Sequence, residues 1–179
     1  FEISANSFFQ TNTFQGEKLY EEVKKAAELG GEEVIYDLYC GTGTIGLFLS
    51  NKAKQVYGFE VIRSALEDAE KNARKNNISN IKFLKANLDT FFKSGQLPKK
   101  IPKPDIMIVD PPRAGMHPDM AQYIPKLNAK KIIYVSCNPT TQARDAKILY
   151  EKGYKLKTGV MVDMFPHTPH IETVVLFSK

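Results

Sequence analysis

The sequence predicts a single α/β domain whose sheet is mostly parallel and is closed by a C-terminal antiparallel hairpin. Short apolar runs alternate with segments of helical spacing along most of the chain, which is typical of a parallel sheet covered by helices on both faces. The last two apolar runs are separated only by residues 164–171, which is too short for a helical crossover. The length of 179 residues suits one domain with a sizeable core.

In the first half of the chain, helices and strands alternate. Apolar residues at helical spacing predict a helix over about residues 17–29, which Gly30 and Gly31 end. The apolar run 34–39 predicts a buried strand, and a helix begins at Ile45 after Gly41 breaks that strand. The next predicted elements are a strand at 55–60, a helix at about 63–76 and a strand at 81–84.

The second half continues this alternation until the hairpin. A loop rich in Pro and Lys, residues 93–103, precedes a fourth strand at 106–109. A fifth strand is predicted at 132–135, and residues 143–150 belong to the helix that follows it. The hairpin strands are predicted at 154–163 and 172–177.

Composition excludes several classes of protein. The chain is 42% hydrophobic and 25% charged, and it has no apolar stretch of about 18 residues that would span a membrane. Its first residues lack the basic start and apolar core of a signal peptide. Two cysteines and three histidines argue against a disulfide framework or a metal site. We therefore expect a cytoplasmic, monomeric protein without metal or membrane contact, and the start at Phe1 predicts a piece of a longer protein.

The charge balance is basic. There are 25 Lys and Arg against 20 Asp and Glu, which gives a net charge of +5 and an isoelectric point near 9.1. The clustered lysines are Lys99, Lys100 and Lys103, followed by Lys126, Lys130 and Lys131. Such clusters are compatible with a polyanionic partner, because Lys and Arg neutralise phosphates. A solvated surface explains the same excess equally well.

A glycine loop follows the first predicted strand. The residues Gly41 to Gly46 satisfy the pattern G-x-G-x-x-G, and Glu60 ends the next strand. Glycines let the backbone approach a ligand closely, and a carboxylate at the tip of the second strand can accept hydrogen bonds from both ribose hydroxyls. The pattern alone does not separate NAD from S-adenosylmethionine.

Two features favour S-adenosylmethionine. The C-terminal hairpin resembles the closing antiparallel strands of the methyltransferase fold. The fourth strand ends in Asp110-Pro111-Pro112-Arg113, which stiffens the backbone at the edge of the sheet where ligands bind. Amino-methylating enzymes carry a similar motif that is usually followed by an aromatic residue, and Arg113 in this position argues against that subclass.

Cys137 ends the fifth predicted strand, at the same edge of the sheet. Asn138 is a good N-cap and Pro139 suits the first helical turn. The partial positive charge of a helix N-terminus favours a thiolate, so we interpret Cys137 as a nucleophile. Cys40, inside the glycine loop, is expected to be a small buried hydrophobic residue.

Five segments together resemble a known family. They are Ser7-Phe8-Phe9-Gln10-Thr11-Asn12, Asp37-Leu38-Tyr39-Cys40-Gly41, Asp110-Pro111-Pro112-Arg113-Ala114-Gly115, Ser136-Cys137-Asn138-Pro139 and His170-Ile171-Glu172-Thr173. The segments occur in the same order as in the catalytic domain of the S-adenosylmethionine-dependent RNA (uracil-5-)-methyltransferases, which modify ribosomal or transfer RNA. The chain therefore resembles this domain. The RNA-binding β-barrel that the family carries before this domain, and the iron–sulfur cysteine cluster of some members, are not in this sequence.

The resemblance implies a Rossmann-like class I methyltransferase fold, with residues 1–179 as one catalytic domain forming the C-terminal part of a longer protein. It also implies that Cys137 adds to carbon 6 of a uracil, which makes carbon 5 nucleophilic enough to accept a methyl group. Glu172 then removes the proton from carbon 5, so that the thiolate can leave. The expected substrate is RNA, with 23S ribosomal RNA expected in preference to transfer RNA.

The same resemblance assigns cofactor contacts. The residues that it places around S-adenosylmethionine are Gln10, Tyr39, Gly41, Thr44, Glu60, Asn87 and Asp110. Among these, Glu60 would bind the ribose and Asn87 the adenine, whereas Thr44 stands where some family members have Asn.

Other residues admit two interpretations. Phe8 and Phe9 would either stack on a flipped base or pack in the core. His167 and His170 are expected to shape the site as loop residues without binding a metal. The alternative functions for the chain are an NAD-dependent oxidoreductase domain, in which Cys137 and Glu172 have no role, and a non-catalytic RNA-binding module.

Overall fold

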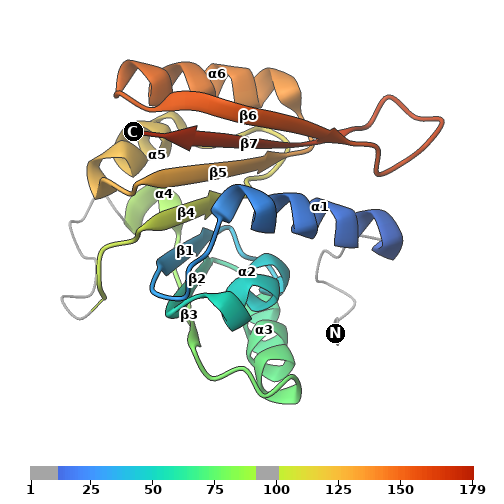
Figure 1. Ribbon diagram of the computed structural model, residues 1–179, viewed down its shortest axis with the longest axis vertical. Helices are drawn as coiled ribbons and strands as arrows, with labels where there is room; N and C mark the ends of the chain where they lie inside the picture. The colour runs from blue at the N-terminus through green and yellow to red at the C-terminus, as the bar shows by residue number, and fades with distance from the viewer. Residues whose placement is uncertain (1–11, 92–100) are drawn as a thin grey trace.

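The computed structural model describes residues 12–91 and 101–179 of the chain (Figure 1). Over these residues, seven strands form one sheet in the order β3-β2-β1-β4-β5-β7-β6. Neighbouring strands from β3 to β5 are parallel, whereas β7 is antiparallel to both β5 and β6. The predicted fold class, a mostly parallel sheet closed by an antiparallel hairpin, is confirmed.

The strands lie close to their predicted positions. Their bounds are β1 Val34–Leu38, β2 Gln55–Glu60, β3 Ile81–Lys85, β4 Ile106–Val109, β5 Lys131–Ser136, β6 Lys155–Val162 and β7 Glu172–Ser178. The helices are α1 Thr13–Ala27, α2 Thr44–Leu49, α3 Arg63–Lys75, α4 Leu88–Phe91, α5 Pro118–Tyr123 and α6 Pro139–Glu151, with 3-10 turns η1 Ser50–Lys52 and η2 Ile124–Leu127.

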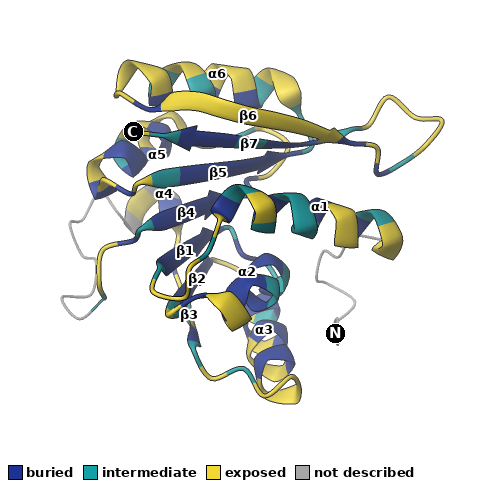
Figure 2. Cartoon of the chain, in the orientation of Figure 1, coloured by how far each residue is buried: buried dark blue, intermediate teal, exposed yellow. Residues whose placement is uncertain are grey.

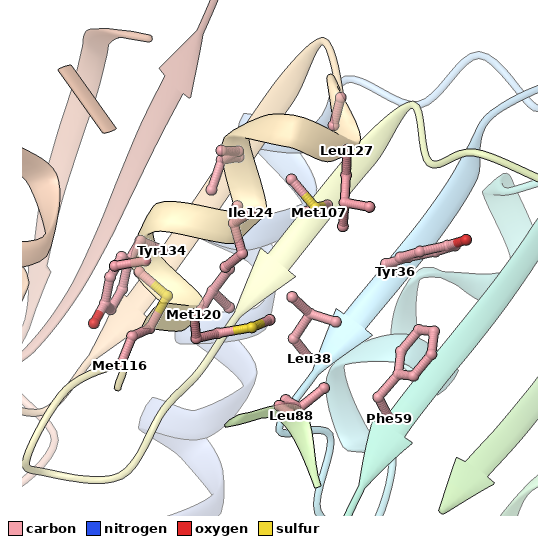
Figure 3. Close-up of a cluster of buried hydrophobic side chains, with 14 of the residues drawn as sticks. Tyr36, Leu38, Phe59, Leu88, Met107, Met116, Met120, Ile124, Leu127 and Tyr134 are labelled. Carbon is pink, nitrogen blue, oxygen red and sulfur yellow. The ribbon is translucent and has the colours of Figure 1, made fainter. Parts of the chain in front are cut away.

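Hydrophobic cores fill both faces of the sheet, because successive strand residues point to opposite sides. On one face, Tyr36, Met107 and Tyr134 pack with Met120 of α5 and Ile124 of η2 (Figure 3). On the other face, buried residues of the same strands pack against α1, α2 and α3. They include Ile35, Ile108, Ile133 and Val135 from the strands, and Leu19, Val23, Ile45 and Leu47 from the helices.

The outer strand β6 has little cover. All of its residues except Val162 are exposed, as Figure 2 shows by its colour. Its neighbour β7 is mostly buried. Most of the buried side chains of the hairpin therefore come from β7 and not from the edge strand β6.

Three helical segments differ from the sequence-based expectation. Helix α1 begins four residues earlier than predicted, because the Asn12 side chain accepts a hydrogen bond from the Gln15 amide at 3.2 Å and caps the helix. The first turn shows no apolar periodicity, since Phe14 is exposed. The short helices α4 and α5 were not predicted, because four to six residues are too few for a helical period to be recognised.

None of the helices in the two described stretches is long and apolar enough to cross a membrane. The parallel arrangement brings the carboxyl ends of β1, β2, β4 and β5 to one edge of the sheet. The antiparallel strand β7 brings its first residue, Glu172, to this same edge.

Candidate active site

A cavity of about 670 Å³ opens at the carboxyl edge of the parallel strands. We call it the edge cavity. The predicted site residues that line it are Tyr39, Gly41, Thr44, Glu60, Asn87, Asp110, Cys137 and Glu172. The structure therefore brings together, around one space, residues that are up to 133 positions apart in the chain, from Tyr39 to Glu172.

The glycine loop is held by a buried carboxylate behind it. Asp37 is 1% exposed, and its Oδ2 accepts a hydrogen bond from the Gly46 amide at 2.9 Å. A Cβ at Gly46 would lie 2.8 Å from that oxygen, so only glycine allows this approach. Burial, together with the nearby charge of Glu60, raises the pKa of Asp37 to about 7, although the hydrogen bond from Gly46 acts in the opposite direction.

Glu60 joins the loop to the start of α3. Its Oε2 accepts a hydrogen bond from the Gly41 amide at 3.0 Å, and its Oε1 accepts from the Val61 and Ile62 amides at 2.8 and 2.9 Å. These three bonds fix the carboxylate at the wall of the edge cavity. Because a carboxylate offers about four lone-pair positions, room remains for a ligand hydroxyl.

Two further carboxylates face the same space. Burial raises the pKa of Glu172 to about 7. Burial also raises the pKa of Asp110 well above its usual range, and the charges of Glu172 and Asp37 add to this effect. Both side chains therefore bind protons far more readily than an exposed carboxylate does.

Cys137 and Glu172 lie at the end of the hydrogen-bonded pairing between β5 and β7, which we call the β5–β7 ladder. Ser136 of β5 is the register partner of Thr173 of β7, so Cys137 follows one member of this pair and Glu172 precedes the other. The Thr173 hydroxyl lies 3.1 Å from the Ser136 carbonyl oxygen and 2.8 Å from Gln142 Oε1 of α6. These contacts bind β7 to the turn that carries Cys137.

The protonation of Cys137 differs from the expectation. Burial raises the pKa of its thiol most, and Glu172 and Asp110 raise it further, whereas Arg113 and a backbone hydrogen bond act in the opposite direction. Because the net effect is a raised pKa, the predicted bias toward a thiolate is wrong for this environment. Cys40 is buried, as expected.

The loop after β4 is docked on α6 by the buried carboxylate of Asp145 and its half-exposed partner Arg144. Asp145 is fully buried, and its Oδ2 accepts hydrogen bonds from the Met116 amide and from the Tyr134 hydroxyl, each at 2.8 Å. Arg144 pairs with Asp145 at 2.8 Å and also donates to the carbonyl oxygens of Ala114 and Met116. This network positions Asp110 and Arg113 at the edge cavity.

The histidines of the hairpin loop have different surroundings. His170 contacts Arg113, with 3.3 Å between His170 Nδ1 and the guanidinium Nη1, whereas His167 is exposed in a turn with a φ of +70°. In the described parts of the chain, no three His, Cys, Asp or Glu residues form a group that could hold a metal ion.

Some predicted residues are not placed by the structure, and one was missed. Gln10, Phe8 and Phe9 lie outside the described residues. Tyr20 of α1 lines the edge cavity together with Thr44. The helical spacing of the sequence predicted Tyr20 only as a core-facing residue of the first helix. Its hydroxyl group, unusual at a core-facing position, could have indicated that it reaches a polar site.

Two of the clustered lysines, Lys130 and Lys131, lie away from the cavity, whereas Lys99 and Lys100 are outside the described residues. Lys131 begins β5, at the opposite end of this strand from Cys137, and pairs with Glu28 at 2.6 Å. Lys130 pairs with Asp105 at 3.0 Å. Because their charges are compensated locally, these two lysines contribute little positive potential to the rim of the edge cavity.

Comparisons with solved structures support the fold. A tRNA (uracil-54, C5)-methyltransferase of Pyrococcus abyssi, solved with S-adenosyl-L-homocysteine, is 39% identical with a TM-score of 0.82, over 98% of this chain and 41% of that chain. A magnesium protoporphyrin IX methyltransferase of Synechocystis has a TM-score of 0.75 at 16% identity, over 100% of this chain and 87% of that chain. At this identity, the second protein supports the fold alone.

Comparisons of sequence assign the family. An uncharacterized RNA methyltransferase of Chlorobaculum tepidum is 49% identical over 100% of this chain and 37% of its own length, and one of Clostridium acetobutylicum is 47% identical over 100% and 38%. The chain thus spans well under half the length of these relatives. A family model described as tRNA (uracil-5-)-methyltransferase matches residues 1–179. A match over this full range places the chain in the tRNA (uracil-5-)-methyltransferase family.

Proposed function

We propose that residues 1–179 are the catalytic domain of an enzyme that transfers a methyl group from S-adenosylmethionine to carbon 5 of a uridine in RNA. The observation that carries this proposal is the placement of Cys137 and Glu172 beside each other at the edge cavity, at the end of the β5–β7 ladder. The relatives named above are RNA methyltransferases that are longer than this chain, which supports the expectation that the domain is part of a longer protein.

The edge cavity fits S-adenosylmethionine in shape and in charge. Phe59, Ala65 and Leu88 give it apolar walls that suit an adenine ring. Glu60 accepts hydrogen bonds at the tip of β2, where a ribose would lie. Asp110 and Glu172 add carboxyl groups to this lining. The positively charged sulfonium and ammonium groups of the cofactor would favour their ionised form, because a nearby opposite charge lowers the pKa of a carboxyl group.

The same features disfavour the NAD alternative. A pyrophosphate would need free amides in the glycine loop. The Gly41 amide donates instead to Glu60 Oε2 at 3.0 Å, and the Gly43 amide to the Cys40 carbonyl oxygen at 2.7 Å.

Two side chains of this chain carry the proposed chemistry. Bound S-adenosylmethionine supplies an electrophilic methyl group. Cys137 adds to carbon 6 of the uracil, which increases the electron density at carbon 5 and makes it reactive toward this methyl group. Glu172 accepts the proton of carbon 5 and allows the thiolate to leave. A carboxyl group with a pKa of about 7 is well matched to accept a proton near neutral pH.

Two classes of RNA are candidate substrates. The sequence led us to expect 23S ribosomal RNA, whereas the Pyrococcus abyssi relative is a transfer RNA methyltransferase. The direct test incubates the full-length protein with methyl-labelled S-adenosylmethionine and unmodified transcripts of each class, followed by nucleoside analysis. Label in 5-methyluridine supports the proposal and identifies the RNA class. Label in another nucleoside, or RNA binding without label, contradicts it and would favour a different methyltransferase or the RNA-binding module.

A further inference from the structure

Arg113 is the one positively charged side chain among the described residues that line the edge cavity. The other charged residues of this lining are Glu60, Asp110 and Glu172, all of them acidic. Arg113 is exposed, so a ligand that enters the cavity can reach it. It is not one of the cofactor or catalytic residues that the sequence led us to expect.

The backbone of Arg113 is fixed against the turn that carries Cys137. Its carbonyl oxygen accepts hydrogen bonds from Asn138 Nδ2 at 3.1 Å and from Thr141 Oγ1 at 3.3 Å. Asn138 directly follows Cys137, and its side chain also caps α6. The position of Arg113 relative to the cysteine is therefore set by direct contacts.

The guanidinium of Arg113 is oriented toward the strand that carries Glu172. Its Nη1 lies 3.3 Å from Nδ1 of His170, two residues before Glu172. Arg113 therefore connects the two segments that bear the proposed catalytic residues. A guanidinium has five N–H donors, so the contact with His170 leaves donors for a ligand.

The proposed reaction creates a negative charge that these carboxylates cannot stabilise. After Cys137 loses its proton to solvent, its sulfur forms a bond to carbon 6, and the π electrons of the C5=C6 bond move toward carbon 4 and leave the charge on O4. Carbon 5 then bonds to the methyl carbon as the bond from that carbon to the sulfonium breaks. Glu172 takes the carbon 5 proton, the charge returns to O4, and the C6–S bond breaks as the C5=C6 bond reforms. A preorganised hydrogen-bond donor near O4 stabilises this anion each time it forms, and a positively charged donor does so most strongly.

We propose that the Arg113 guanidinium donates hydrogen bonds to O4 of the target uracil and stabilises the anion that forms when Cys137 adds to carbon 6. This inference rests on the proposed function, since it concerns the same reaction. It assigns Arg113 a role in the covalent step and distinguishes this role from a contact with an RNA phosphate, which would contribute to binding alone.

The test uses the full-length protein and whichever unmodified transcript, transfer or ribosomal RNA, accepts the methyl group. Single-turnover formation of the protein–RNA adduct is measured at saturating RNA for the wild type, Arg113→Gln and Arg113→Lys. Removal of one donor to a developing oxyanion slows the reaction by about 100-fold or more. We expect this loss for Arg113→Gln, a partial recovery for Arg113→Lys, and an unchanged Kd for S-adenosylhomocysteine in both.

A matched control removes the same charge elsewhere. Arg74 of α3 is exposed and pairs only loosely with Glu70, at 3.7 Å, so Arg74→Gln reports the general effect of one lost positive charge on RNA attraction. A normal adduct rate for Arg113→Gln at saturating RNA, with only weaker RNA binding, overturns the assignment in favour of a phosphate contact. Methylation by the wild type with no adduct at any time overturns both this inference and the covalent mechanism.

Discussion

Cys137 and Glu172 lie immediately beyond the last register pair of the β5–β7 ladder, in which Ser136 faces Thr173. The antiparallel closing strand therefore has a functional consequence. It brings a carboxylate from the C-terminal hairpin to a cysteine at the end of a parallel strand, and both line the edge cavity. A sheet with parallel strands alone would place the start of its last strand at the opposite edge.

The first prediction concerns Glu60. Glu60→Ala removes the acceptor for a ribose hydroxyl and leaves the amides of Gly41, Val61 and Ile62 without their acceptor. Binding of S-adenosylhomocysteine should weaken by about 1–3 kcal/mol, measured by isothermal titration. Glu67→Ala, an exposed position on α3, serves as the control. Equal dissociation constants for wild type and Glu60→Ala would remove Glu60 from the cofactor site.

The second prediction concerns the packing of the glycine loop. Gly43 has a φ of +77°, and a Cβ there would lie 2.7 Å from the Phe83 ring. Gly31 has a φ of +103° with open space around it, so Gly31→Ala isolates the backbone strain. We expect Gly43→Ala to lower the free energy of unfolding by about 1–3 kcal/mol more than Gly31→Ala does, measured by urea denaturation. Equal losses would mean that Phe83 moves aside without cost.

The third prediction concerns the contact that holds β7 to β5. Thr173→Val removes the hydroxyl that reaches the Ser136 carbonyl oxygen and Gln142 Oε1, and leaves both acceptors buried. The free energy of unfolding should fall by about 1–3 kcal/mol. Thr158→Val, at an exposed position of the edge strand β6, should change it little. A similar small effect for both variants would show that the Thr173 hydroxyl does not stabilise this junction.

The fourth prediction concerns the pH dependence of stability. Burial raises the pKa of Glu172 to about 7 in the folded protein, from 4.5 as its ordinary value. Between these values the folded state holds the proton and the unfolded state loses it, so this group stabilises the fold below pH 4.5 and this contribution is lost as the pH rises through 7. Glu172→Gln removes the effect.

Thermal unfolding of wild type and Glu172→Gln at two pH values measures this effect. The Tm of the variant minus the Tm of the wild type should be larger at pH 8 than at pH 5. Asp37, whose pKa is also raised, is present in both proteins and cancels in the comparison. Asp110 is coupled to Glu172, and its pKa falls when the charge of Glu172 is removed, which changes the difference in Tm in the same direction. A difference in Tm that is the same at both pH values would contradict a buried, proton-binding Glu172. Glu67→Gln, an exposed substitution, controls for the chemical change.

The sequence predicted the sheet well because its central strands β1, β2, β4 and β5 are buried on both faces. The apolar runs of β2 and β4 were located to the residue, and the short loop before Glu172 predicted the antiparallel hairpin. The glycine and Asp-Pro-Pro motifs predicted where the site lies, since each follows a parallel strand.

Properties that depend on contacts between distant segments were not predicted. The raised pKa of Cys137 follows from its burial and from Glu172 and Asp110, which the fold brings close from other strands. Tyr20 reaches the edge cavity from α1, a helix that sequence patterns describe only as amphipathic. The docking of the Asp110 loop through Asp145 is likewise a tertiary interaction.

The covalent mechanism is the central claim, and one experiment tests it most directly. Full-length wild type, Cys137→Ala, Glu172→Gln and the double variant are incubated with labelled RNA and S-adenosylmethionine and separated on a denaturing gel. Glu172→Gln retains the nucleophile but lacks the base, so methylated RNA should accumulate attached to the protein. Cys137→Ala and the double variant should show neither adduct nor methylation. Methylation by Cys137→Ala at the wild-type rate would contradict the mechanism, and an adduct in that variant would point to Cys40, the other cysteine of the chain.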